Sequence, residues 1–475
     1  MPSASASPCP ALPPPSRGPR HLLRLIAALL VALLLHGLVF WTLRQIVLAV
    51  QQFGGGVEII ASPAPEAPPQ QPVAQRIAST AHVPTNAAPP DFASQALAAS
   101  ATGDAMPLVP FTSQWQPTDP GANLGAATPI FSGGGGMGLP QKMRARMSPE
   151  SRLQLILKNG GTPQTEDAVA RALLWLSEHQ NLDGSWGRDY PAAMTGLAVL
   201  CFLGHGDTPD SKQHGQVVSR GITFLTDLQA RNRSMISTHP SSGQAAYEHG
   251  IATYALGEAY AMARFGQKGL GPIAEGFFEG VRLILKGQTK RGGWLYGYEP
   301  GEGGDTSVTG WQYQALKIAD QTRLTFPSLK EQLQRTAKFL LSVRGPDGGF
   351  GYRFSADRPS LTAVGVLGLQ FIDAKRHEAA IVKGLKFMFR HSEEQRWSSA
   401  NLYSWYYNTQ ATFQFGGSAW ERWNGVFREE VLKHQKEDGH WIHGSTNGAK
   451  DDTDLFCTTL CTLMLEVYYR YAVGG

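Results

Sequence analysis

The sequence predicts an all-α protein whose C-terminal part, residues 148–475, is an α6/α6 toroid, a ring of six helix pairs. Two observations carry this prediction. A short polar turn of fixed length recurs six times, and each turn lies between an amphipathic stretch and a more uniformly apolar stretch. A core of this size is feasible because 42% of the 475 residues are hydrophobic. The repeats follow an apolar segment and a long Pro- and Ala-rich segment.

The six turns keep one spacing, from a polar first residue to a large residue six positions later. Their starts are 44 to 59 residues apart, which leaves room for two helices and two loops. They are Gln180–Trp186, Gln229–Met235, Gln288–Trp294, Arg344–Phe350, His391–Trp397 and Gln435–Trp441. A glutamine amide satisfies free backbone groups at a helix end, and the large residue packs into a neighbouring unit, so we interpret the turns as structural.

The helices around the turns are of two kinds. Residues 168–179 and 336–343 have one apolar stripe opposite charged residues, which is typical of an outer ring that faces solvent. The stretches after the turns, such as 192–204 and 360–372, are apolar nearly all round, which predicts an inner ring. The glycines expected to permit the tight backbone of the turns are Gly184, Gly293, Gly349 and Gly439.

Charge and cysteine content exclude several classes. The net charge is only +4 and no dense basic run is present, so we expect no nucleic-acid partner. The four cysteines have no CxxC spacing, so we expect neither a zinc knuckle nor a disulfide framework. Cys457 and Cys461 share a helix face and are expected to be core thiols. No cofactor and no metal site are predicted.

The N-terminus predicts a membrane anchor. Residues 1–21 form a short basic tail, and residues 22–50 contain an uncharged apolar run, Leu25 to Leu43, that is long enough to span a bilayer as a helix. A cleaved secretory signal is the alternative, but the run is long for one and no small-x-small cleavage site follows it. Arginines precede the span, so we expect the tail in the cytoplasm and the ring domain on the extracytoplasmic, periplasmic side.

Residues 51–147 are expected to be a disordered linker, because a segment so rich in Pro, Ala, Ser and Gly has few apolar groups to offset its ordering entropy. His36 is the one ionisable residue within the apolar run. The basic tail, the "LLLHG" span and the Pro-rich "ASPAPEAPPQQP" resemble the N-terminus of TonB-type energy-transducing proteins. Ala32 departs from that pattern, because the family usually has a serine there. The resemblance implies a membrane protein complex as a partner.

The repeats resemble the squalene-hopene cyclases and the wider prenyltransferase and squalene-oxidase repeat superfamily. The turns Gln180–Trp186 and Gln435–Trp441 carry the Q-x-x-D-G-x-W pattern of that family. The stretches "YEHGIATYALGEAY", "DTSVTGWQYQAL" and "RPSLTAVGVLGL" and the C-terminal "LEVYYRY" resemble a bacterial, membrane-anchored branch. The resemblance covers about 310 residues and implies a helical toroid with a central cavity for an isoprenoid or another hydrophobic ligand.

The chemistry of the family is only partly present. Cyclases of the superfamily protonate their substrate with the central aspartate of a D-x-D-D-T motif. Asp305 and Thr306 keep the end of that motif, but Gly304 stands where the acid belongs. Residues 449–453 keep Asp451, Asp452 and Thr453, and Lys450 beside Asp451 favours its ionised form.

Protein prenyltransferases of the superfamily hold zinc with Asp, Cys and His. Here Ser307 stands in place of the thiolate, and the next repeat offers no imidazole, so zinc is not expected.

Other helical toroids act on polysaccharides with paired carboxylates at the mouth of the ring. Glu248 (with His249 beside it), Asp305, Asp451 and Asp452 all lie near starts of inner helices, so they are the candidate catalytic residues. The candidate ligand-binding residues are Tyr247, Thr306, Thr309, Trp311, Trp405, Tyr406, Tyr407 and Thr453. Asp305, Thr306 and Thr453 also fit helix N-caps, Glu248 and His249 also fit a structural pair, and the aromatic residues also fit a core.

We therefore expect a membrane-anchored ring protein that binds an isoprenoid or another hydrophobic small molecule, with terpene-cyclase-like activity a further option. One alternative is an exported scaffold or binding protein coupled to a membrane complex through the anchor. The other alternative is a polysaccharide-active enzyme. The deciding feature is whether a carboxylic acid faces an apolar cavity.

Overall fold

The computed structural model of the chain describes residues 141–475, except 233, 264–269, 300, 323, 392–395, 444–451 and 472–475. The expected anchor, His36 and the expected linker up to residue 140 lie outside these residues. All described residues belong to one compact unit, residues 87–475. Among them, no helix is long and apolar enough to cross a membrane.

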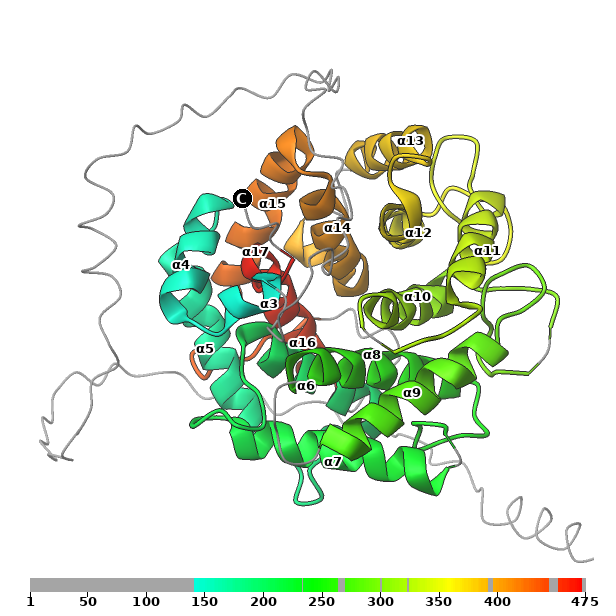
Figure 1. Ribbon diagram of the computed structural model, residues 1–475. Coiled ribbons are helices and arrows are strands. Elements are labelled where there is room, and N and C mark those ends of the chain that lie inside the picture. The colour runs from blue at the N-terminus through cyan, green and yellow to red at the C-terminus, as the bar shows by residue number, and fades with distance from the viewer. Residues whose placement is uncertain are drawn as a thin grey trace, which may run out of the picture. The chain divides into compact units, whose positions relative to one another are not determined.

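Twelve of the described helices form two concentric rings (Figure 1). The outer helices are α5 (Pro163–Glu178), α7 (Gly215–Arg231), α9 (Leu270–Lys286), α11 (Leu329–Ser342), α13 (Glu378–Arg390) and α15 (Gly417–Lys433). The inner helices are α6 (Pro191–His205), α8 (Ala245–Ala263), α10 (Thr306–Asp320), α12 (Pro359–Asp373), α14 (Leu402–Phe415) and α16 (Thr453–Leu465). Each inner helix contacts the next, and α16 contacts α6, so the inner ring is closed. The predicted all-α ring is confirmed in this part of the chain.

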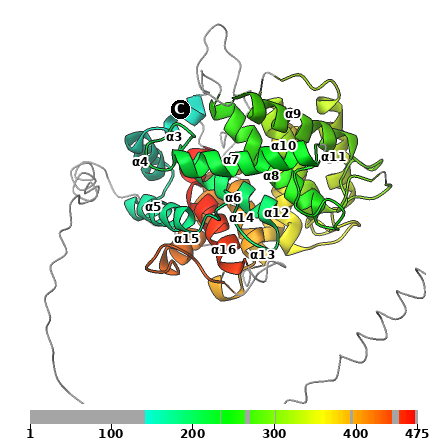
Figure 2. The same cartoon turned by 90° about the horizontal axis from the view of Figure 1, so that it is seen from below.

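The two rings differ in burial as the sequence predicts. In α6 every residue from Ala192 to Gly204 is buried, because α8, α16 and the outer helices cover it on all sides. In the outer helix α7 the buried residues recur every three or four positions, which leaves one face for solvent. Figure 2 shows the same rings from a perpendicular direction. Cys457 and Cys461 are buried in α16, as expected for core thiols.

Three of the recurring turns fasten an outer helix to the inner helix of the same repeat. The indole nitrogens of Trp186, Trp294 and Trp441 donate to the carbonyls of Leu176, Ile284 and Val431, which lie in the last turns of α5, α9 and α15. Each carbonyl also accepts the backbone N–H of the residue that follows its helix, His179, Gly287 or His434, at 3.2 to 3.3 Å, so the indole adds a second hydrogen bond at the helix end. The backbone N–H groups of the three tryptophans donate to the threonine hydroxyls of Thr195, Thr309 and Thr458 on α6, α10 and α16.

The glutamines of the turns fasten neighbouring outer helices to each other. The Gln180 amide donates to Gly184 O within its turn and to Val217 O of α7. The Gln435 amide donates in the same way to Gly439 O and to Ala168 O of α5, which joins the last repeat to the first. The structural interpretation of these turns is therefore confirmed, and Gln435 closes the outer ring.

For two of the turns, the glycine expected to permit the tight backbone was predicted one position too late in the sequence. The left-handed backbone occurs at Gly184, Gly292, Gly348 and Gly439, with φ of 88°, 93°, 103° and 101°. Gly293 and Gly349 follow these positions and do not adopt a positive φ. Both are tightly enclosed instead, since a Cβ on Gly349 would lie 2.7 Å from the Cα of Asp357. The second turn also departs from the pattern, because the buried residue is Ile236 and not Met235.

Three further helices close the end of the ring where the inner helices finish. They are α3 (Gln141–Arg146), α4 (Pro149–Lys158) and α17 (Val467–Arg470). Arg146 and Arg470, each at most 3% exposed, both donate to the buried carboxylate of Glu258 on α8, at 2.9 and 2.8 Å. Arg146 also donates to the carbonyl of Arg470 at 2.7 Å. The packed part of the chain therefore begins before residue 148, inside the range expected to be linker.

Glu466, between α16 and α17, is the second carboxyl at this closed end. Its side chain is fully buried against Gly204, and neither carboxyl oxygen has a hydrogen-bond partner among the described residues. Burial raises the pKa of Glu466 well above its usual range. The folded protein therefore favours the protonated, neutral form of this carboxyl, whereas in the unfolded chain the carboxyl ionises near pH 4.3.

We expect Glu466→Gln to stabilise the protein at pH 8 and to have little effect at pH 4. Because the folded pKa is raised, wild-type stability falls as pH rises above the unfolded pKa, by about 1.4 kcal/mol per pH unit until the folded pKa is reached. A glutamine has no such dependence. Thermal unfolding at both pH values measures the difference in stability between the variant and the wild type. The control is Glu437→Gln, at an exposed position in the Gln435–Trp441 turn. A variant destabilised equally at both pH values would show that the carboxyl is held by hydrogen bonds.

Candidate functional site

A cavity of about 380 Å³ lies at the end of the ring where the inner helices begin. All six inner helices contribute to its wall from their first turns or caps, through Tyr190, Glu248, Ser307, Leu361, Tyr403 and Phe456. The inner helices therefore run in the same direction, and their N-terminal ends converge on one cavity. Its size is that of a site for a small organic ligand.

Much of the wall is apolar or aromatic. Ala193, Met194 and Ile251 project into the cavity from α6 and α8, and Trp311 lies a turn inside α10. Trp311 stacks on Tyr406 with ring centroids 5.5 Å apart. An apolar ligand body can therefore replace water against this surface without leaving a polar group unpaired.

Tyrosine hydroxyls and small polar groups complete the wall. The Tyr247 hydroxyl lies 2.6 Å from the Ser307 hydroxyl, and the Tyr403 hydroxyl donates to the Ser307 carbonyl at 3.1 Å. Burial raises the pKa of both tyrosines, so they remain neutral hydrogen-bonding groups. Tyr247, expected to bind ligand, thus lies in the wall of the cavity.

Asp305 adjoins the cavity but acts as the N-cap of α10. One carboxylate oxygen accepts from the Ser307 N–H and hydroxyl, at 3.0 and 2.6 Å. The other accepts from the Tyr296 hydroxyl at 3.1 Å and lies 3.7 Å from the Arg353 guanidinium. Every contact treats Asp305 as an acceptor, so the geometry does not present it as a proton donor to the cavity.

Thr306 and Thr309 face away from the cavity. The Thr306 hydroxyl donates to the Gly351 carbonyl at 2.6 Å, which fixes the loop before α12. The Thr309 hydroxyl accepts from the Trp294 N–H at 3.1 Å, in the role that Thr195 has in the first repeat. The structure thus gives both residues local contacts in place of the expected ligand contacts.

Glu248 and His249 are adjacent in sequence but face different surroundings. Glu248 lines the cavity, whereas His249 lies between the 232–244 segment and α9. The His249 Nδ1 accepts from the Ile236 N–H at 2.9 Å and Nε2 lies 3.0 Å from the Gly280 carbonyl, so Nε2 carries the proton. Burial lowers the pKa of His249 to about 4. His249 is thus a neutral structural residue and not the acid-base partner of Glu248.

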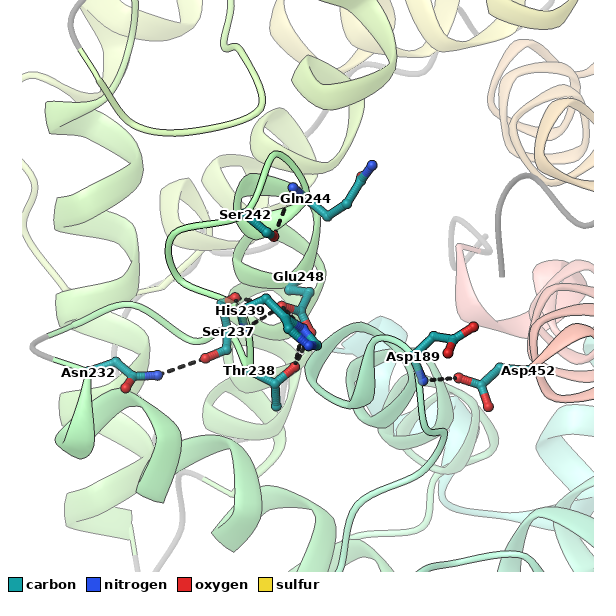
Figure 3. Close-up of polar contacts among 9 residues, drawn as sticks. All are labelled: Asp189, Asn232, Ser237, Thr238, His239, Ser242, Gln244, Glu248 and Asp452. Atoms are coloured by element: carbon teal, nitrogen blue, oxygen red, sulfur yellow. Dashed lines mark hydrogen bonds and ion pairs between the residues drawn. The ribbon is translucent and has the colours of Figure 1, made fainter. Parts of the chain in front are cut away.

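The histidine beside the Glu248 carboxylate is His239, ten positions before His249 (Figure 3). Glu248 is fully buried and accepts from the hydroxyls of Ser237 and Thr238, at 2.5 and 2.7 Å, and from the His239 N–H at 3.3 Å. The His239 Nδ1 lies 3.1 Å from the Thr238 hydroxyl and 3.8 Å from the nearer Glu248 oxygen. These contacts place a partly exposed imidazole at the edge of the cavity.

Asp452 is a backbone-binding residue next to this site. Its carboxylate accepts from the N–H groups of Arg188 and Asp189 at 2.9 to 3.0 Å, as Figure 3 shows for Asp189. It joins the start of α16 to the turn before α6. Asp451 lies outside the described residues, and Thr453 is half-buried at the start of α16, outside the cavity wall.

The aromatic cluster of α14 is mainly core. Trp405 packs against Trp397 and Trp423, away from the cavity. Tyr406 and Tyr407 are buried behind Trp311 and contact the Gln314 amide at 3.2 and 3.0 Å. Of the eight expected ligand-binding residues, Tyr247 and Trp311 lie in the cavity wall.

Several residues of the wall were not among the expected ligand-binding residues. They are Tyr190, Gln244, Tyr296, Tyr352, Ser360, Asn401 and Tyr403. Most of them lie at the caps and first turns of the inner helices, so the same position in each repeat would have indicated them. His239 lies in a loop without a repeat equivalent. Among the described residues, no three or more His, Cys, Asp or Glu side chains lie close enough together to hold a metal ion.

No family model matches the sequence, and no curated protein matches it. Solved structures with a similar fold include a variant of the type II terpene cyclase MstE from Scytonema, in complex with its substrate geranylgeranyl dihydroxybenzoate. It is 12% identical, with a TM-score of 0.43, and the match covers 68% of this chain and 99% of the cyclase. The GH76A α-1,6-mannanase from Salegentibacter sp. HEL1_6 is 9% identical, with a TM-score of 0.48 and coverage of 64% and 98%. At this level the likenesses do not distinguish between activities.

Proposed function

We propose that the ring domain binds a small hydrophobic molecule with a polar end, of the isoprenoid type, in the cavity where the inner helices begin. The observation that carries this proposal is the composition of the wall. Ala193, Met194, Ile251 and Trp311 supply an apolar surface. Buried tyrosine and serine hydroxyls, such as those of Tyr247 and Ser307, supply hydrogen bonds that orient a polar end.

Binding is proposed in preference to cyclisation. Initiation by protonation needs a carboxylic acid that faces the apolar cavity with its proton available. Gly304 stands at the motif position for this acid, and Asp305 is occupied by Ser307, Tyr296 and Arg353. The expected anchor at residues 22–50 is part of the proposal, because it would hold the ring close to a lipid source.

Filling the cavity should abolish ligand binding. We expect the full chain in detergent to retain tritiated geranylgeraniol, and Ala193→Leu to lose it, because the added carbons occupy the space for the apolar body. Equilibrium dialysis measures the bound fraction. Ala379→Leu, on the exposed face of α13, is the matched control and should bind as wild type does. Equal binding by the two leucine variants would place the ligand elsewhere and defeat the proposal.

A carbohydrate is the second candidate ligand. The Gln244 and Asn401 side chains line the cavity together with tyrosines and Trp311, and aromatic faces with amide groups also suit a sugar ring. Mannotriose in the same dialysis experiment separates the two classes. Retention of the sugar without geranylgeraniol would favour the polysaccharide hypothesis. The scaffold hypothesis depends on His36 and the anchor, outside the described residues, and stays a prediction.

A further inference from the structure

We propose that His239 is a general base for ester hydrolysis at the edge of the cavity, with Thr238 and Glu248 as its positioning residues. This activity goes beyond ligand binding and does not depend on which ligand fills the cavity. The substrate class is an acyl ester of a hydroxylated compound.

The direction of two hydrogen bonds fixes the tautomer of His239. The Thr238 hydroxyl donates its single proton to Glu248 Oε1, at 2.7 Å, because a carboxylate only accepts. The same hydroxyl oxygen lies 3.1 Å from His239 Nδ1 and has only acceptor capacity left for it. Nδ1 must therefore carry a proton and donate it. In the neutral imidazole this leaves Nε2 with a free lone pair, which is the state a general base requires.

Hydrogen bonds hold the Glu248 carboxylate and the 236–239 segment in place. The Glu248 carboxylate lies on the first turn of α8, and Ser237 and the His239 N–H bind its second oxygen at 2.5 and 3.3 Å. The segment before it is fixed by the Ile236 N–H on His249 and by the Asn232 amide on the Ser237 carbonyl. Figure 3 shows Ser237, Thr238 and His239 of the loop around Glu248 of α8. A base positioned in this way loses little entropy when the substrate arrives.

The imidazole is partly exposed and lies beside a residue of the cavity wall. Its side chain is 48% exposed, and its ring meets the edge of Tyr190, a residue of the cavity wall, with centroids 6.2 Å apart. Within the described residues, no hydrogen-bond partner engages Nε2.

Water is the nucleophile in the proposed hydrolysis. Nε2 accepts a proton from a water while the water oxygen forms a bond to the acyl carbon and the carbonyl electrons move to oxygen. When the carbonyl reforms, the ester C–O bond breaks and its electron pair leaves with the alcohol oxygen. The imidazolium returns its proton to that oxygen or to solvent. The carboxylic acid that forms loses its remaining proton to solvent, so the products are a carboxylate and an alcohol, and no oxidant or cofactor is required.

The probe is p-nitrophenyl acetate with the full chain in detergent, and the readout is kcat and KM for p-nitrophenolate release. We expect His239→Gln and Thr238→Val to lower kcat at least about tenfold with KM retained, because general-base contributions are large. Thr238→Ser keeps the hydroxyl and should rescue the rate. His391→Gln, at the end of α13 outside the cavity wall, is the matched histidine control and should match wild type.

Three outcomes would overturn the proposal. They are no release above heat-denatured protein, a His239→Gln or Thr238→Val variant as fast as wild type, and a Thr238→Ser variant as slow as Thr238→Val. Chemical modification of the unmutated chain tests the proposal even if a variant misfolds. Diethyl pyrocarbonate should modify His239, identified by peptide mass, and stop the hydrolysis in parallel. Hydrolysis that survives complete modification of His239 would also refute the proposal.

Discussion

Glu258→Gln is expected to destabilise the folded ring by about 3–5 kcal/mol, because it leaves two buried arginines without their counter-charge. Glu258 is 2% exposed and accepts from both Arg146 and Arg470. Glu258 connects α8 to α3 and α17, which are distant from it in the sequence. Urea unfolding followed by circular dichroism measures the loss. Glu302→Gln is the control, because its ion pair with Lys290 is about three-quarters exposed and should leave the midpoint unchanged.

The same carboxylate gives stability a defined pH dependence. Burial alone would raise the pKa of Glu258, but Arg470 and Arg146 lower it to about 2. Because the folded pKa lies below the unfolded value near 4.3, the contribution is complete above that value and is lost as pH falls toward 2. Glu258→Gln should therefore lose its disadvantage in acid. A variant as stable as the Glu302 control at neutral pH would show that the arginines do not depend on Glu258.

Trp441→Ala should cost about 3–5 kcal/mol, the range for truncating a fully buried large aromatic residue. Trp441 is fully buried, caps α15 through Val431 and binds Thr458 of α16. It lies in the turn whose Gln435 joins the sixth repeat to α5, so its loss weakens ring closure as well as local packing. The free energy of unfolding from urea titration is the measure.

The control for this variant is Phe354→Ala, since Phe354 is aromatic but 75% exposed. We expect only a small change in the free energy of unfolding for this control, because the exposed Phe354 ring makes little contact with the rest of the protein. Native-state hydrogen exchange adds a second readout. In Trp441→Ala, the amides of α5 and α15 should exchange faster than those of α11. Uniform exchange across the ring would contradict a special role for the closing turn.

The periodic part of the fold could be predicted from sequence, because each repeat satisfies the same physical needs. The glutamine, the glycine and the large residue of each turn are close in sequence, so their spacing indicated the helix pairs. The error at Gly293 and Gly349 has a local cause. Each of those turns contains two adjacent glycines. Gly184 lies four positions after the first residue of its turn, and the same spacing selects the earlier glycine of each pair, Gly292 or Gly348.

The site was less predictable because it depends on contacts between distant segments. Adjacency suggested His249 as the partner of Glu248, but consecutive helical residues point about 100° apart. The partner, His239, comes from a loop whose path is set by Asn232, Ile236 and His249 together. The arginines around Glu258 are also absent from any repeat, so no periodic pattern indicated them.

The common direction of the six inner helices gives the ring an electrical axis. Each helix carries a partial positive charge at its start and a partial negative charge at its end, so six of them act together. At the far end two arginines, Arg146 and Arg470, share the single carboxylate of Glu258, so cationic side chains lie at the negative pole. At the opposite pole, a bound molecule with a polar end should align with its more electronegative atoms toward the helix starts. Entry into the cavity is thereby directional, with one preferred orientation for an asymmetric ligand.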